Sequence, residues 1–243
     1  MHQRTTSWYS PCLQRDMPVA VYGHYGFALL LIPTAAADFL EYERFGLIES
    51  LRPFIDGGKL KIYSVNSINN DSWMNYDAHP LHKTYMHKQW NYYVFDELIP
   101  FIKSDTSWET PVYSCGASFG ALHAANLFFK RPDLLNGCIP MSGVYDLTEY
   151  TRGYFDEDVY FNSPMHYMPN LTDHNMLQQI RASNHIHLFS ACGEYEDPES
   201  AKRFAGILYG KGINYELNIW GPEWRHDWNT WRAALPYYID TRF

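Results

Sequence analysis

The chain has 243 residues, of which 46% are hydrophobic and 19% are charged, as in a globular protein with a sizeable buried core. Its formal net charge of −8 argues against nucleic acid and anionic membranes as partners, because both require clustered positive charge. No apolar run resembles a signal peptide or reaches the length of a membrane span. We therefore expect a single cytoplasmic domain over residues 1–243.

The first half of the chain predicts an alternation of strands and helices. Strands are predicted at residues 17–22, 28–32 and 59–65, a helix at residues 42–54 and a longer helix at residues 82–103. Because strand, helix and strand follow one another, we expect a parallel crossover. The inward face of the longer helix is expected to carry Tyr85, Tyr92, Val94, Phe95, Leu98 and Ile102.

The second half continues this pattern, with strands predicted at residues 137–142, 185–191 and 214–220 and helices at residues 199–209 and 227–238. Four cysteines show no C-x-x-C spacing, which favours buried free thiols in a reducing compartment. They are Cys12, Cys115, Cys138 and Cys192.

Residues 145–175 are aromatic and irregular, and too long for a simple connection. Insertions of this length often line or cover a binding site, so the segment is a candidate lid. A packed surface excursion is equally compatible with its sequence. Both interpretations stay open at this point.

The strongest functional signal lies in residues 111–131, where a short apolar strand, a glycine-bracketed turn and a helix follow one another. The turn places Ser118 in the nucleophile-elbow pattern G-x-S-x-G, between Gly116 and Gly120. The glycines leave room for a tight turn, and the start of the helix offers free N–H groups to a developing oxyanion. The alternative is an ordinary turn whose serine caps a helix. The readable strand and helix on either side favour the elbow.

A serine hydroxyl becomes a useful nucleophile when a base takes its proton, and the base works best when a carboxylate fixes its tautomer. In α/β-hydrolases, serine, acid and histidine follow in that chain order, each after a strand. Of the 11 histidines, His226 alone stands just beyond the last predicted strand. His123 is expected to pack within the elbow helix. One local group matches no zinc spacing and is expected at a solvated helix start: His79, His82 and His87.

Three carboxylates compete for the acid position after the strand at residues 185–191: Glu194, Glu196 and Asp197. Counting the pattern G-x-x-D from Gly193 selects Glu196, with Asp197 as the close alternative. Instead of acting as the catalytic acid, these side chains could cap the helix that follows.

The oxyanion hole is expected to combine the amide of Phe119 with one amide from the loop after the strand at residues 28–32. Three small residues occupy that loop: Thr34, Ala35 and Ala36. Ala35 is the preferred donor.

With these parts in place, the chain resembles the esterase D-like family of α/β-hydrolases, which includes feruloyl and polyhydroxyalkanoate esterases. The likeness covers nearly the whole chain and is carried most specifically by GASFGALHAANLFFKRPDL and WRHDWNTWRAALPYYI. It implies an α/β-hydrolase fold, with a mostly parallel central sheet and helices on both faces. It also implies a serine carboxylester hydrolase that needs neither cofactor nor metal. The Thr-Ala-Ala-Ala loop departs from the glycine-rich oxyanion turn expected there.

A small-molecule ester is the expected substrate. An acyltransferase with the same residues and a non-catalytic hydrolase-fold binding protein are the alternatives. The exposed share of a 17% aromatic content would favour a homo-oligomer. Aromatic residues that would suit an apolar acyl pocket are Tyr150, Tyr154, Phe155, Tyr160 and Phe161.

Overall fold

A computed structural model describes residues 1–243, and its centre is a sheet of eight strands. The strands are β1 (Gln3–Ser10), β2 (Arg15–Tyr22), β3 (Phe27–Ile32), β4 (Leu60–Val65), β5 (Val112–Ala117), β6 (Gly137–Met141), β7 (His185–Ala191) and β8 (Glu216–Trp220). They lie in the order β1-β2-β4-β3-β5-β6-β7-β8. β2 pairs antiparallel with β1 and β4, and all other neighbours are parallel, which confirms the mostly parallel sheet.

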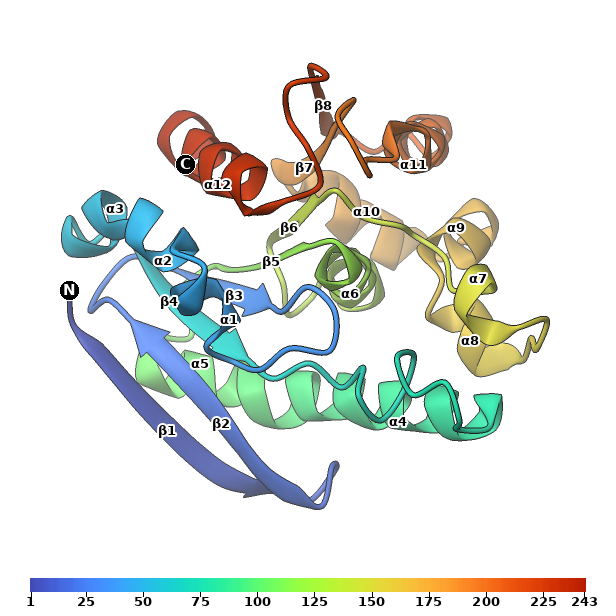
Figure 1. The fold of residues 1–243 in the computed structure, drawn as a ribbon, viewed down its shortest axis with the longest axis horizontal. Coiled ribbons are helices and arrows are strands. Elements are labelled where there is room, and N and C mark those ends of the chain that lie inside the picture. The colour runs from blue at the N-terminus through green and yellow to red at the C-terminus, as the bar shows by residue number, and fades with distance from the viewer.

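Helices cover both faces of this sheet (Figure 1). They are α1 (Glu41–Arg44), α2 (Leu47–Ser50), α3 (Arg52–Asp56), α4 (Pro80–Tyr92), the π-helical η1 (Tyr93–Leu98), α5 (Ile99–Asp105), α6 (Phe119–Lys130), α7 (Thr148–Thr151), α8 (Glu157–Phe161), α9 (Pro164–Tyr167), the 3₁₀ helix η2 (Met168–Asn170), α10 (His174–Ala182), α11 (Pro198–Gly210) and α12 (Trp228–Arg242). None of them combines the length and apolar character that crossing a membrane requires.

The central strands are buried on both faces. Along β3, Leu29 and Leu31 pack under α1 to α3 and α12, whereas Leu30 and Ile32 pack under α4 to α6 and α11. Two apolar layers therefore sandwich the sheet, and the uniformly apolar sequence of β3 is the expected signature of that burial. Because the parallel strands run in one direction, the loops after β3, β5, β7 and β8 meet at one edge of the sheet.

Several sequence predictions of secondary structure are corrected by the structure. The helix predicted at residues 42–54 is three short helices, since Gly46 adopts a left-handed φ of 74° and Pro53 supplies no N–H. The long helix widens into η1 just before Pro100, which likewise has no N–H to donate. Strand β1 was missed because it is an edge strand with no buried apolar face.

The prediction of which residues of the long helix face inward is wrong for α4 and correct for η1 and α5. Tyr85 and Tyr92 are 50% and 43% exposed, while the later apolar positions are buried. The buried face of α4 carries polar groups instead, among them His87 and Asn91. His87 accepts a hydrogen bond from the indole of Trp73 at 3.1 Å, so its predicted place at a solvated helix start is also wrong.

The remaining corrections concern the thiols and the segment 145–175. Cys115 and Cys138 are buried as predicted, whereas Cys12 is partly exposed and Cys192 is exposed; all four are free. The segment predicted as irregular contains the helices α7, α8, α9 and η2. Its function as a lid remains a prediction.

The C-terminal helix is fixed to the sheet by a paired carboxylate. Arg242 of α12 donates to both oxygens of Glu216 on β8, at 2.8 and 2.7 Å. This guanidinium lowers the pKa of Glu216 to about 2. A carboxylate with a lowered pKa in the folded state stabilises the protein above its ordinary pKa, and that contribution is lost as pH falls towards 2.

We therefore expect Glu216→Gln to lower the free energy of unfolding by about 1 kcal/mol at pH 7, since the pair is partly screened by solvent. The difference should shrink as pH falls from 5 to 2. Urea titrations at several pH values measure it, with Glu199→Gln, which removes the carboxylate of an exposed ion pair with Lys202, as control. A difference independent of pH would contradict the assignment.

Candidate active site

Ser118 lies at the turn between β5 and α6 in a strained backbone conformation. Its φ of 56° and ψ of −124° are rare for a residue with a side chain. Both flanking glycines are needed, because a Cβ on Gly116 would collide with the carbonyl of Gly120, and one on Gly120 with the carbonyl of Ile32. The turn thus has the conformation that the G-x-S-x-G pattern predicts.

His226 lies beside this serine, on the loop between β8 and α12. Its Nε2 is 2.9 Å from Ser118 Oγ. The loop is held at both ends: the amide of His226 donates to the carbonyl of Glu194 at 3.0 Å, and Asp227 caps α12. The ring stands edge-on to Trp231, with centroids 5.2 Å apart.

Glu196 lies on the other side of His226, with its Oε1 3.5 Å from Nδ1. The carboxylate is fully buried, and Oε2 accepts from Ser190 Oγ at 2.9 Å and from the amide of Ala191 at 3.3 Å. Burial raises the pKa of Glu196, but hydrogen bonds from His226, Ser142 and Ser190 outweigh it, so the pKa is lowered overall. Oε1 has no other partner, and 3.5 Å is long for a hydrogen bond; such contacts commonly shorten when substrate binds.

The two competing carboxylates are occupied elsewhere. Asp197 caps α11 by accepting from the amide of Glu199 at 3.1 Å, and its side chain is exposed. Glu194 pairs with Arg225 on the surface at 3.3 Å. Of the three predicted acids, the structure places only Glu196 against the imidazole of His226.

The loop after β3 lies directly against the elbow. The amide of Gly120 donates to the carbonyl of Thr34 at 3.0 Å. The amide of Thr34 is itself engaged by the carboxylate of Glu41 at 2.8 Å, whereas the amides of Ala35, Ala36 and Phe119 donate to no protein group. The two predicted oxyanion donors are therefore both free, and Thr34 is not.

Some contributing residues had no signal in the sequence. The hydroxyl of Tyr42 bridges the two strand ends, donating to the carbonyl of Ile32 at 2.7 Å and accepting from the amide of Ala117 at 3.1 Å. Ser142 accepts from the indole of Trp231 at 3.0 Å, and it is one of the groups that lower the pKa of Glu196. Tyr42 and Ser142 each contact groups that are far away in the sequence, and only the folded structure brings these groups together.

A hollow of about 200 Å³ opens above the serine. It is lined by Ser118, Phe119, Ser142, Gly143, Val144, Tyr150, Tyr195, Asp197 and His226. Of the five aromatic residues predicted for an acyl pocket, only Tyr150 lines this hollow. Phe155 and Phe161 are 56% and 47% exposed, so that part of the prediction is wrong.

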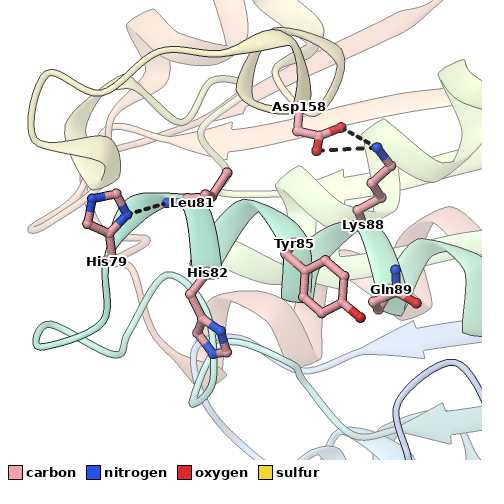
Figure 2. A pocket seen from close by; sticks show the side chains of 7 residues that line it. All are labelled: His79, Leu81, His82, Tyr85, Lys88, Gln89 and Asp158. Carbon is pink, nitrogen blue, oxygen red and sulfur yellow. Dashed lines mark hydrogen bonds and ion pairs between the residues drawn. The ribbon is translucent and has the colours of Figure 1, made fainter.

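A larger hollow, of about 770 Å³, lies elsewhere, between α4 and α8 (Figure 2). Figure 2 shows His79 turned back onto the amide of Leu81 at the start of α4, and Lys88 paired with Asp158 across the hollow. It contains none of the residues around Ser118 and no hydroxyl next to a base. No group of three or more His, Cys, Asp or Glu residues is placed to hold a metal ion.

Solved structures similar to this one span nearly the whole chain. A ferulic acid esterase has a TM-score of 0.75 at 15% identity, with 98% of each chain covered. S-formylglutathione hydrolases from Staphylococcus aureus and Agrobacterium tumefaciens have TM-scores of 0.67 and 0.73 at 15% and 12% identity. The likeness covers 98% of this chain and 96% and 93% of theirs, respectively. No protein-family model and no curated protein sequence matches the chain.

The strand order and these likenesses agree with the predicted architecture. The chain has the α/β-hydrolase fold, which it shares with these hydrolases.

Proposed function

We propose that this chain is a serine carboxylester hydrolase that works through Ser118, His226 and Glu196. The observation that carries the proposal is the 2.9 Å contact between Ser118 Oγ and His226 Nε2, made at a strained turn next to two free backbone amides. Of these structural neighbours, one is named as an esterase and two as S-formylglutathione hydrolases, which supports hydrolysis as the reaction class.

In the proposed reaction, Ser118 Oγ attacks the ester carbonyl while Nε2 of His226 accepts the hydroxyl proton. Glu196, ionised and buried, keeps the other ring nitrogen protonated and stabilises the imidazolium that forms. The amides of Phe119 and Ala35 donate to the oxyanion, His226 returns the proton to the leaving alcohol, and water then releases the acyl group by the same path.

The hollow above Ser118 favours esters with a small acyl group. Its volume of about 200 Å³ and its lining by Phe119, Val144 and Tyr150 suit a short or planar apolar acyl chain. Nitrophenyl esters of increasing acyl length should therefore be hydrolysed with kcat/KM that falls steeply beyond the short chains.

Reaction with a fluorophosphonate probe tests the nucleophile directly. The probe should modify a single serine, which peptide mapping identifies as Ser118. The matched control is Ser114→Ala, in the same strand, whose buried hydroxyl donates to the carbonyl of Ala124 and faces away from the site; this variant should still be labelled. An intact chain that the probe leaves unmodified would instead indicate a non-catalytic binding protein.

A further inference from the structure

The loop after β3 has every carbonyl from Thr34 to Ala37 bound to the protein. The donors are the amide of Gly120 at 3.0 Å for Thr34, Ser67 Oγ and Asn69 Nδ2 at 2.8 Å for Ala35, Asn70 Nδ2 at 2.8 Å for Ala36, and the amide of Ser67 at 3.1 Å for Ala37. In a planar trans peptide the N–H points opposite to the preceding C=O. The loop therefore turns its carbonyls towards the protein and its amides away from these donors.

Ala35 is held on both sides by this arrangement. Gly120 of the elbow fixes the peptide plane before Ala35, and Asn69 fixes the plane after it. The free N–H of Ala35 lies in the first of these planes, which Gly120 holds, while Asn69 anchors the same residue through the second plane, which carries the N–H of Ala36.

Asn69 is fully buried, and a second buried side chain orients it. Its Oδ1 lies 3.0 Å from Nε2 of His123, on the elbow helix. Since Nδ2 of Asn69 is committed to the carbonyl of Ala35, Oδ1 must accept, so His123 carries its proton on Nε2. Burial lowers the pKa of His123 to about 3, which keeps the ring neutral at ordinary pH. His123 packs against Phe119 and Trp90, with centroids 5.3 and 4.8 Å away.

We propose that Asn69, oriented by His123, is a positioning residue that anchors Ala35 through its carbonyl, so that the amide of Ala35, which Gly120 orients through the carbonyl of Thr34, stays where the oxyanion develops. This inference rests on the proposed esterase function and adds to it. The elbow helix then contributes to both halves of the oxyanion hole. Phe119 supplies one amide, and His123 orients Asn69, which anchors the residue that supplies the other.

Asn69→Ala should lower kcat for p-nitrophenyl acetate by about 30-fold with KM changed less than threefold, since complete loss of one oxyanion donor typically costs 10²- to 10³-fold. The affinity for phenylboronic acid, which forms a tetrahedral adduct with the serine, should fall by a similar factor. A merely structural role would not change kcat and boronate affinity in parallel. His123→Gln, which keeps an N–H donor, should retain most of the activity that His123→Leu loses.

Asn126→Ala is the matched control, because this buried asparagine on the same helix bonds to Asn162 and Tyr167 at 2.9 and 3.2 Å and not to the loop. It should lower stability but leave kcat within threefold. Ser67→Ala removes the other donor to Ala35 and an acceptor for the amide of Asn69, and it should lower kcat about threefold.

The outcomes separate this inference from the function on which it rests. Wild-type hydrolysis that disappears in Ser118→Ala, combined with an Asn69→Ala kcat no lower than that of Asn126→Ala, would overturn the positioning role alone. Hydrolysis that survives in Ser118→Ala would overturn the proposed function, and the positioning role with it.

Discussion

Ser118→Ala is expected to lower kcat for nitrophenyl ester hydrolysis by about 10⁴-fold or more, with little change in stability. The hydroxyl is the only group within reach of Nε2 of His226 that can form the acyl-enzyme, at 2.9 Å. Alanine fits the same turn, although its positive φ remains strained, so the fold should persist. Discontinuous assays at known protein concentration measure kcat, and thermal unfolding checks the fold.

A double variant that combines Ser118→Ala with His226→Ala tests the proposed mechanism more stringently. Each single variant should lose a similar factor, and the double variant should be no slower than either, because the two side chains act as one unit. His82→Ala, an exposed histidine of the hollow in Figure 2, should keep full activity. Losses that multiply in the double variant would mean that the two groups act independently, contrary to the proposed mechanism.

The fold was largely predictable because its central strands carry a simple signal. β3 is apolar at every position since both its faces are covered, and the alternation with helices implies parallel neighbours. β1, which was missed, and α4, whose buried face was predicted wrongly, share one cause. Neither has an apolar face that is clearly separated from a polar face in its sequence. β1 exposes alternate residues with no apolar stripe, and the buried face of α4 carries His87 and Asn91.

The nucleophile turn was predictable from sequence for a steric reason. Only glycine fits at positions 116 and 120, where a side chain would collide with the backbone. The G-x-S-x-G sequence therefore indicates the tight turn directly. His226 followed from chain order, since few histidines stand directly after a strand. Neither inference needed knowledge of distant contacts.

The positioning contacts could not be predicted, because no local pattern encodes them. Tyr42 and Asn69 act on backbone groups 75 and 34 residues away in the chain, at Ala117 and Ala35. Their side chains look like those of any helix or loop until the fold brings the partners within 3.1 Å. The loop over residues 34–37 contains no glycine, and such contacts from outside the loop hold it in place.

The choice between Glu196 and Asp197 depended on one backbone conformation. Tyr195 adopts a left-handed φ of 65°, which turns the chain so that Glu196 faces inward to Ser190 while Asp197 faces outward to cap α11. Nothing in the sequence marks a tyrosine for that conformation, which residues other than glycine and asparagine rarely adopt. Counting from Gly193 favoured Glu196 in the sequence, but the reason why the two neighbours face opposite ways is visible only in three dimensions.

Glu196→Gln is expected to lower kcat on the order of 10³-fold, and Asp197→Asn less than threefold. An amide at position 196 removes the negative charge that stabilises the imidazolium, and it can present N–H to Nδ1 and so favour the wrong tautomer. Asn caps a helix about as well as Asp, so Asp197→Asn should also leave stability nearly unchanged. Kinetics with p-nitrophenyl acetate measure both variants.

A third variant separates the two roles of these neighbours. Asp197→Ala removes the cap of α11 and should lower the free energy of unfolding by about 1 kcal/mol while kcat stays within threefold. Glu196→Gln should instead lose mainly kcat, because its amide oxygen can still accept from Ser190 Oγ and from the amide of Ala191. If Asp197→Asn instead loses more activity than Glu196→Gln, the acid is Asp197, and the loop containing Tyr195 must rearrange to bring it to His226 during the reaction.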